Sequence, residues 1–154
     1  MTHLIGLCGE YGSGKSLLAE YMKKKGFIEY AFAYPLKQIA LTVGFSYNEV
    51  YGTQQDKETK NTYWGISARE FLQKFGTEIC REQLPQIIPQ MENVFIRCFE
   101  KKYTETKSNM VVSDVRFIDE VISIKKLGGV IIKIIREIDL KKNDEKKVIV
   151  IFYK

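Results

Sequence analysis

The chain has 154 residues, of which 45% are hydrophobic, and this is enough for one compact domain with a substantial core. It contains no run of about 18 apolar residues and opens directly on a short strand-like segment, so we expect no membrane span and no export signal. The formal net charge of +5 is compatible with nucleic acid, an anionic membrane or small phosphorylated ligands, and charge alone does not choose among them.

Cysteine and lysine usage indicates the setting of the protein. The three cysteines are odd in number and have no metal-ligand spacing, which favours a reduced, cytoplasmic protein; they are Cys8, Cys80 and Cys98. The lysine runs at 23–25 and 141–147 are typical of solvated surfaces, and they lack the interleaved aromatic residues of a single-strand binder. Nucleic acid therefore ranks last among the candidate partners.

The first two predicted elements are a strand and a helix joined by glycines. Residues 3–8 are mostly apolar, the pattern of a short strand buried on both faces of a parallel sheet. From Lys15 to Lys25 apolar residues recur at helical spacing, lysines favour the helix C-terminus, and Gly26 supplies a stop.

A second strand, a helix and an insertion are predicted next. Residues 27–33 are rich in aromatic side chains and predict a strand, and Pro35 stands in the first turn of a helix that ends near Gly44. Residues 45–65 are polar and weakly periodic. We expect a mobile surface insertion there that takes part in substrate binding.

Two helices are predicted in the middle of the chain. Ser67 with Glu70 matches a capping box, and apolar residues follow at helical spacing as far as Ile79. A second helix is expected from Pro85 towards Tyr103.

The C-terminal part is predicted to complete the sheet. Residues 110–113 and 130–135 predict the third and fourth strands, and residues 148–153 are a candidate fifth. A helix over 117–127 is expected to end at Gly128-Gly129 and to turn four apolar residues inward, namely Ile118, Val121, Ile122 and Leu127. Strands alternating with helices imply an open α/β sheet with helices on both faces.

The segment 9–16 carries the clearest chemical signal. It reads Gly-Glu-Tyr-Gly-Ser-Gly-Lys-Ser, which matches Gly-x-x-x-x-Gly-Lys-Ser, and it lies between a predicted strand and a predicted helix as a phosphate-binding P-loop requires. Glycines let successive backbone amides and the helix N-terminus face phosphate oxygens. We therefore predict that ATP is bound by Gly9, Gly12, Ser13, Gly14, Lys15 and Ser16.

Three side chains are predicted to handle the phosphates and a metal ion. Lys15 supplies a cation for the β- and γ-phosphates, and the Ser16 hydroxyl is placed to ligate Mg²⁺. A P-loop also needs an acidic residue at the end of a neighbouring strand, where Asp114 follows the third strand. The alternative role for Asp114 is to cap the helix that starts near residue 117.

Arginines are the candidate ligands of the acceptor phosphate, because their planar fork meets phosphate oxygens bidentately. Arg116 and Arg136 follow strand ends, where ligands of doubly wound sheets bind. Arg69 lies in the first turn of its helix, where a cation opposes the helix dipole unless an anion is near. For Arg69 and Arg116 the alternative is a surface salt bridge.

The sequence resembles the deoxynucleoside monophosphate kinases of large bacteriophages and related viruses, a branch of the P-loop nucleotide kinases. Four segments carry the resemblance: the P-loop at 9–16, Phe-Ala-Tyr-Pro-Leu-Lys at 32–37, Ala-Arg-Glu-Phe-Leu-Gln-Lys-Phe-Gly-Thr-Glu at 68–78, and Val-Val-Ser-Asp-Val-Arg-Phe at 111–117, which continues to Arg136. The P-loop identifies a large superfamily, whereas the combination of the last two segments is much more particular.

The resemblance implies a fold, a reaction and a set of site residues. The expected fold is the three-layer P-loop NTPase sandwich, with a mostly parallel five-stranded sheet and helices on both faces. The expected reaction is transfer of a phosphoryl group from ATP with Mg²⁺ to a deoxynucleoside monophosphate. Arg69 and Arg116 would lie near the acceptor phosphate, Gln73 within reach of its base, and Lys37 in the same pocket.

Two departures from the family pattern concern the base and the lid. Relatives carry a tryptophan on the helix after the glycine-threonine element, where this chain offers Phe95. Relatives also continue past the arginine matched by Arg136 with a lid that contains a histidine and an acidic residue, whereas residues 137–154 contain no histidine and no arginine. We expect one kinase domain over 1–154 with a shortened lid and tail at 137–154.

Other functions remain open at this point. One is another small P-loop kinase that acts on a ribonucleotide or a cofactor precursor. Another is a truncated nucleotide-binding module that holds phosphate without transferring it. The sequence leaves open which base is accepted and whether the protein forms a homodimer.

Overall fold

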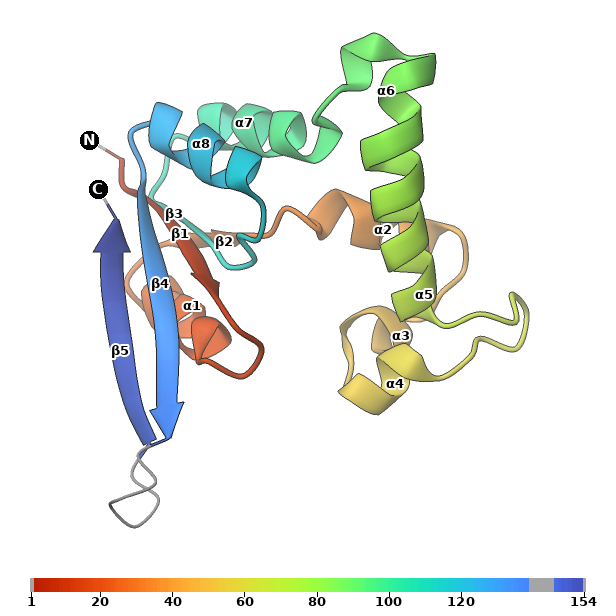
Figure 1. The fold of residues 1–154 in the computed structure, drawn as a ribbon, viewed down its shortest axis with the longest axis horizontal. Helices are drawn as coiled ribbons and strands as arrows, with labels where there is room; N and C mark the ends of the chain where they lie inside the picture. The colour runs from red at the N-terminus through yellow and green to blue at the C-terminus, as the bar shows by residue number, and fades with distance from the viewer. Residues whose placement is uncertain (1, 139–145, 154) are drawn as a thin grey trace. The chain divides into compact units, whose positions relative to one another are not determined.

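The computed structural model describes residues 2–138 and 146–153, which form two compact units (Figure 1). The first unit comprises Met1–Phe32 and Cys98–Lys154, and the second comprises Ala33–Arg97. Within the described residues, no helix is long and apolar enough to cross a membrane.

The first unit is built on a sheet with the strand order β2-β3-β1-β4-β5. Its strands are β1 (Leu4–Gly9), β2 (Ile28–Tyr30), β3 (Met110–Val112), β4 (Val130–Ile138) and β5 (Lys146–Tyr153). The pairs β2 with β3, β3 with β1 and β1 with β4 are parallel, and β5 runs antiparallel to β4. The predicted α/β class with a mostly parallel sheet is therefore confirmed.

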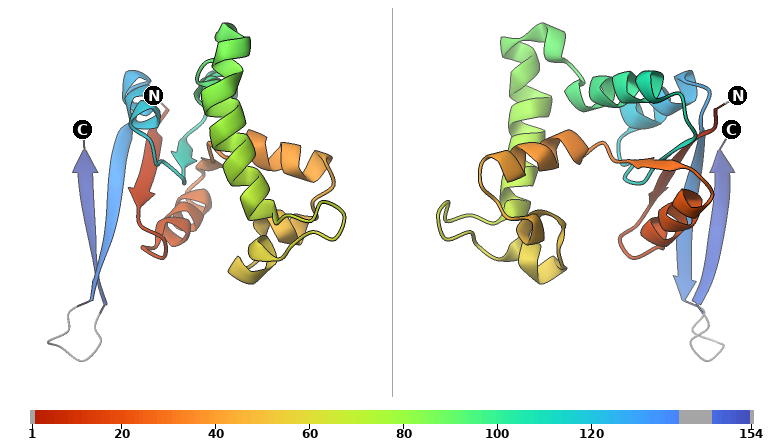
Figure 2. Two further views of the ribbon diagram at one scale, coloured as in Figure 1. Left: turned by 45° about the vertical axis from the view of Figure 1, so that its right-hand side comes forward. Right: turned by 180° about the vertical axis from the view of Figure 1, so that it is seen from behind.

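Helices cover both faces of this sheet, as the alternation of residues along β1 demonstrates (Figure 2). Leu7 belongs to a buried cluster with Ala19 of α1 (Lys15–Lys24). Its neighbour Gly6 faces the other way, because a Cβ atom there would lie 2.7 Å from Ile124 of α8 (Ile118–Lys126). Successive residues of a strand point to opposite faces, so α1 and α8 lie on opposite sides of β1.

The buried face of α8 differs from the prediction. Ile118 and Ile122, expected to point inward, are 78% and 44% exposed, and the buried residues are instead Glu120, Ser123 and Ile124. Polar contacts explain why this side of α8 is the buried one. The Glu120 carboxylate accepts backbone N–H groups just before the helix, and Ser123 Oγ lies 2.7 Å from the carboxylate of Glu100 in α7 (Val94–Thr106). A prediction that places only apolar residues on the buried side of a helix misses a buried side that contains polar residues.

The second unit begins with four short helices. They are α2 (Tyr34–Thr42), α3 (Tyr47–Tyr51), α4 (Gln54–Glu58) and α5 (Ala68–Gln73). Their shared core contains Ala40, Phe45, Val50 and Ala68. The polar stretch 45–65 thus contains two helices that the hydrophobic pattern did not reveal. Each begins with a capping box, Ser46 with Glu49 and Thr53 with Asp56, and these pairs were the available sequence signal.

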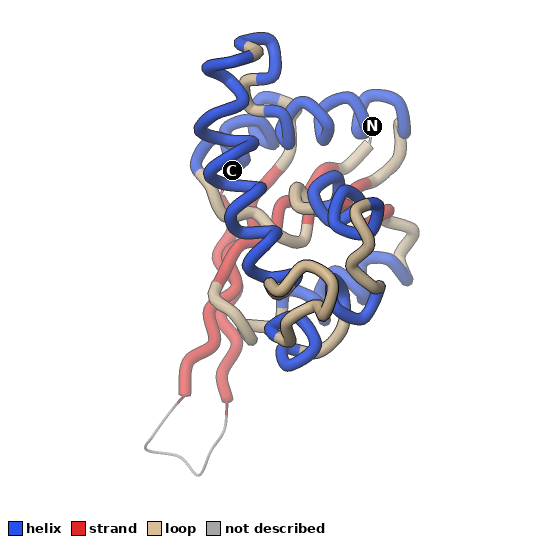
Figure 3. Tube along the Cα trace, turned by 90° about the vertical axis from the view of Figure 1, so that its right-hand side faces the viewer, coloured by secondary structure: helices blue, strands red, loops and turns tan. Residues whose placement is uncertain are grey.

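Helix α5 is the first part of a long continuous helix, seen as one unbroken coil in Figure 3. Helix α5 continues as a π-helix over Lys74–Gln83 and then as α6 (Leu84–Ile87), before a 3-10 turn at Pro89–Met91. The predicted helix start at Pro85 is therefore wrong. Pro85 lies inside this continuous helix, at the start of its α6 segment, and the break falls after Ile87.

Candidate functional site

The predicted phosphate-binding segment lies between the end of β1 and the start of α1, and we call residues 9–16 the glycine loop. Strand β1 lies between β3 and β4 in the sheet. The loop therefore leaves from the carboxyl end of an interior parallel strand, the edge at which open α/β sheets bind their ligands.

Glycines are required by the backbone of this loop. Gly9, Gly12 and Gly14 have φ angles of 143°, 75° and 107°, values that favour glycine over other residues. A Cβ atom at Gly9 would overlap the carbonyl oxygen of Ile134 and approach Ser13 Oγ to 2.9 Å. Gly14 forms the N-cap of α1, and among the described residues no side chain caps that helix start. The first amides of α1 are thus suited to an anionic ligand.

The Lys15 side chain folds back over the glycine loop. Its ammonium donates to the carbonyl oxygens of Gly9 at 2.7 Å and Glu10 at 2.6 Å. Partial burial lowers the pKa of Lys15 from its ordinary value, and the positive charge of Arg116 lowers it further. Both causes oppose the charge of the ammonium. A bound anion would relieve this cost, so the electrostatics of the loop fit a phosphate group.

The two serines of the loop differ in environment. Ser13 is only 4% exposed, and its hydroxyl oxygen has no hydrogen-bond partner among the described residues. An unpartnered buried hydroxyl is costly, so a ligand able to accept or donate there would be stabilised. Ser16 lies in the first turn of α1 and is exposed, as a hydroxyl that binds a metal on the phosphates must be.

Asp114 and Arg116 lie on the segment that follows β3. Asp114 Oδ1 accepts the backbone N–H of Phe32 at 2.7 Å, and the Val115 N–H donates to Leu7 O of β1 at 3.1 Å. These bonds hold the segment beside β1, at the sheet edge from which the glycine loop leaves. The structure therefore brings Asp114 and Arg116 to the same edge as Lys15.

Glu120 performs the capping that was one alternative for Asp114. This carboxylate is 1% exposed and accepts the N–H groups of Arg116 at 2.8 Å and Phe117 at 3.1 Å. It thereby fixes the backbone of Arg116. Glu120 was not predicted as a site residue, although an acidic residue at the third position of a helix is a known capping signal.

Glu120→Ala is expected to lower the free energy of unfolding by about 1–3 kcal/mol, because two N–H groups lose their buried acceptor. Urea denaturation would measure the loss. Asp119→Ala is the matched control, because this exposed neighbour contributes only a helix-dipole effect of about 0.3–1 kcal/mol. Equal losses for the two variants would contradict the capping role.

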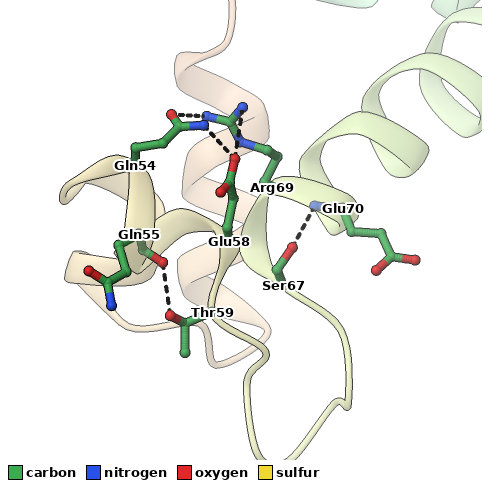
Figure 4. A network of polar contacts seen from close by, with 7 residues as sticks. All are labelled: Gln54, Gln55, Glu58, Thr59, Ser67, Arg69 and Glu70. Atoms are coloured by element: carbon green, nitrogen blue, oxygen red, sulfur yellow. Dashed lines mark hydrogen bonds and ion pairs between the residues drawn. The ribbon is translucent and has the colours of Figure 1, made fainter.

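The remaining predicted residues with described side chains belong to the second unit. The ammonium of Lys37 in α2 lies 4.6 Å from the centre of the Tyr51 ring. Arg69 in α5 contacts Glu58 and Gln54 of α4 (Figure 4). Gln73 is exposed one helical turn further along α5. Arg69 and Gln73 therefore lie on the same side of that helix.

Phe95 and Arg136 were matched to positions of the family pattern, but Phe95 has a packing role and the Arg136 side chain is not among the described residues. Phe95, which stands where relatives carry a tryptophan, is buried in a core cluster with Leu36 and Cys80, so its ring serves packing. Arg136 lies on β4 two residues beyond Ile134, which pairs with Gly9, but its side chain lies outside the described residues. The same holds for residues 139–145 and 154 of the predicted lid and tail.

A metal ion at the glycine loop would need ligands from the nucleotide. Within residues 2–138 and 146–153, no group of three or more His, Cys, Asp or Glu side chains is arranged to hold a metal. Ser16 and Asp114 provide oxygen ligands of the kind that Mg²⁺ prefers, and phosphate oxygens and water would complete the coordination. The residues present thus fit a magnesium ion that arrives with a nucleotide.

Comparison with known proteins identifies a relative. No family model matches the chain. The chain is 42% identical over 142 residues to a protein of Acanthamoeba polyphaga mimivirus with the name "Putative deoxynucleotide monophosphate kinase". The match covers 86% of this chain and 74% of the relative.

Proposed function

This chain belongs to the family of the viral deoxynucleotide monophosphate kinases, and from that premise we propose that it transfers the γ-phosphoryl group of ATP to a deoxynucleoside monophosphate. The products are ADP and the deoxynucleoside diphosphate. The observation that carries the proposal is the glycine loop, whose positive φ angles, uncapped helix start and folded-back lysine suit a polyphosphate. The fold is proposed to be the P-loop NTPase sandwich.

The first unit is proposed to bind the nucleotide donor. Backbone amides of the glycine loop hold the phosphate oxygens, and Lys15 moves from the loop carbonyls to the β- and γ-phosphates. Ser16 and Asp114 would hold Mg²⁺, and the ion would supply positive charge to the phosphate oxygens. Arg116, whose backbone Glu120 fixes, neutralises charge on the transferred group and the acceptor, and Arg136 is assigned the same task.

The second unit is proposed to contribute to binding of the acceptor. Arg69 contacts the acceptor phosphate, Gln73 the base, and Lys37 lies in the same pocket. The insertion 45–65 takes part through Gln54 and Glu58 of α4, whose side chains contact Arg69.

The reaction needs no protein nucleophile. A phosphate oxygen of the acceptor forms a bond to the γ-phosphorus, and the bond from that phosphorus to the bridging oxygen of ADP breaks. Catalysis then consists of positioning and charge stabilisation.

The three free thiols, Cys8, Cys80 and Cys98, agree with the proposed cytoplasmic location, because reduced cysteines are typical of that compartment.

A panel of acceptors tests the proposal. The protein is incubated with ATP, Mg²⁺ and each deoxynucleoside or ribonucleoside monophosphate, and ADP is measured. We expect ADP with at least one deoxynucleotide and none after chelation of Mg²⁺. Turnover with ribonucleotides alone would identify another small P-loop kinase, and ATP binding without any turnover would identify a nucleotide-binding module.

A further inference from the structure

Arg69, the proposed ligand of the acceptor phosphate, already has an anionic partner within the second unit. Its Nη1 lies 3.6 Å from Glu58 Oε1, and its Nη2 donates to Gln54 Oε1 at 2.7 Å. Gln54 Nε2 in turn donates to Glu58 Oε1. Figure 4 shows the resulting triangle, in which the amide oxygen of Gln54 bonds to Arg69 and its amide nitrogen bonds to Glu58.

The helix that carries this triangle is attached to the unit by surface contacts. Helix α4 has five residues and buries none of them, and its start depends on the capping box of Thr53 and Asp56. Segments with few buried apolar contacts open at low free-energy cost. Glu58 and Gln54 can therefore move away from Arg69 while the core of the unit, formed by α2, α3 and α5, stays packed.

The ion pair is of the kind that a stronger anion displaces. The side chains of Arg69 and Glu58 are 46% and 53% exposed, and 3.6 Å is longer than the 2.7–2.9 Å of a tight charge-assisted bond. A phosphate monoester carries more charge than a carboxylate and accepts two parallel bonds from the guanidinium fork. The carboxylate thus stands where a phosphate oxygen would bind.

We propose that Glu58, oriented by Gln54, forms an ion pair with the Arg69 guanidinium until the acceptor phosphate displaces its carboxylate. This competition sets the affinity of the protein for the acceptor. The inference rests on the proposed function. Glu58 is a positioning residue in this scheme: it lowers the affinity of Arg69 for weakly charged anions, which do not outcompete a carboxylate that is already in place.

A merely structural salt bridge would give the opposite kinetic result. If the pair only fixed Arg69 for binding, removal of the carboxylate would disorder the guanidinium and raise the KM for the acceptor. If Glu58 competes with the phosphate, its removal lowers that KM. The direction of the change therefore separates the two roles.

The test measures KM and kcat for the best deoxynucleotide at saturating ATP. For Glu58→Gln we expect a KM about two- to fivefold lower, the range implied by exposed ion pairs, with kcat unchanged. Glu92→Gln, which neutralises an exposed carboxylate elsewhere in the unit, is expected to behave as wild type. An equal or higher KM for Glu58→Gln would overturn the inference.

A second pair of variants tests the part played by Gln54. Gln54→Ala removes both bonds of its amide and is expected to lower the KM, by less than Glu58→Gln does. Gln55→Ala changes the next residue of the same exposed helix, whose side chain points away from Arg69 in Figure 4, and is expected to leave the KM unchanged. A higher KM for Gln54→Ala would count against the inference.

Direct binding separates a failure of this inference from a failure of the proposed function. Calorimetric titration with the deoxynucleotide in the absence of ATP gives the acceptor Kd for each variant. If wild type neither binds nor phosphorylates any deoxynucleotide, the proposed function and the inference both fall. If wild type is active and its Kd equals that of Glu58→Gln, the inference alone falls.

Discussion

Lys15→Ala is expected to lower kcat for phosphoryl transfer by about 10²–10³-fold, the loss seen when one preorganised donor to transition-state charge is removed. The free energy of unfolding should change by less than about 1 kcal/mol, because the side chain is only half-buried and its partners are loop carbonyls that water can solvate. Its removal also relieves repulsion from Arg116, the second cause that lowers the pKa of Lys15.

Steady-state rates of ADP formation and urea denaturation would measure the two quantities side by side. Lys24→Ala is the matched control, because Lys24 is an exposed lysine in the last turn of the same helix. It removes the same charge from the chain at a distance from the glycine loop. A Lys15→Ala protein that keeps full turnover would exclude the assigned role, and one that unfolds would show that the lysine is structural.

Much of the first unit was predictable from the sequence, because its signals are local. A short apolar run, glycines and a helical pattern in succession predicted β1, the glycine loop and α1, and the structure has them in that order. The same holds for β3 and for Gly128, whose φ of 79° ends α8. In each case the residues that set the conformation are adjacent in the sequence.

Two features of the first unit that the sequence did not predict depend on contacts between residues far apart in the chain. Ser123 of α8 lies within hydrogen-bond distance of Glu100 of α7, so the buried side of α8 includes polar residues beside Ile124, and hydrophobic periodicity selects the wrong side. Asp114 is held by the backbone of Phe32, a partner that no spacing rule provides. Such partners exist only once the chain has folded, which limits prediction from periodicity alone.

The neighbourhood of Arg69 illustrates both cases in one place. Ser67 was predicted as the start of its helix, and Ser67 Oγ does accept the Glu70 N–H at 3.1 Å. The partners of Arg69, by contrast, come from α4, a helix that the polar stretch 45–65 concealed. The sequence therefore located the candidate arginine and missed the carboxylate that holds it.

Gly9→Ala is expected to lower the free energy of unfolding by roughly 2–5 kcal/mol, the sum of a left-handed backbone penalty and the cost of forcing atoms into packed space. Its φ of 143° disfavours an L side chain, and the added Cβ would overlap the Ile134 carbonyl oxygen of the paired strand. The Ile134 carbonyl belongs to the backbone of a strand paired with β1 and cannot rotate away as a side chain would, so β1 and β4 must separate or the loop must move. Either change displaces the amides proposed to hold phosphate, and ATP affinity should fall with stability.

Gly12→Ala provides the contrast that isolates the packing contribution. Gly12 also has a positive φ, of 75°, but a Cβ atom there would have nothing within 4 Å. Only the backbone penalty of about 1–2 kcal/mol then applies, so urea denaturation should find Gly12→Ala clearly more stable than Gly9→Ala. Equal losses would mean that the close approach of Gly9 to β4 does not constrain the conformation of the glycine loop.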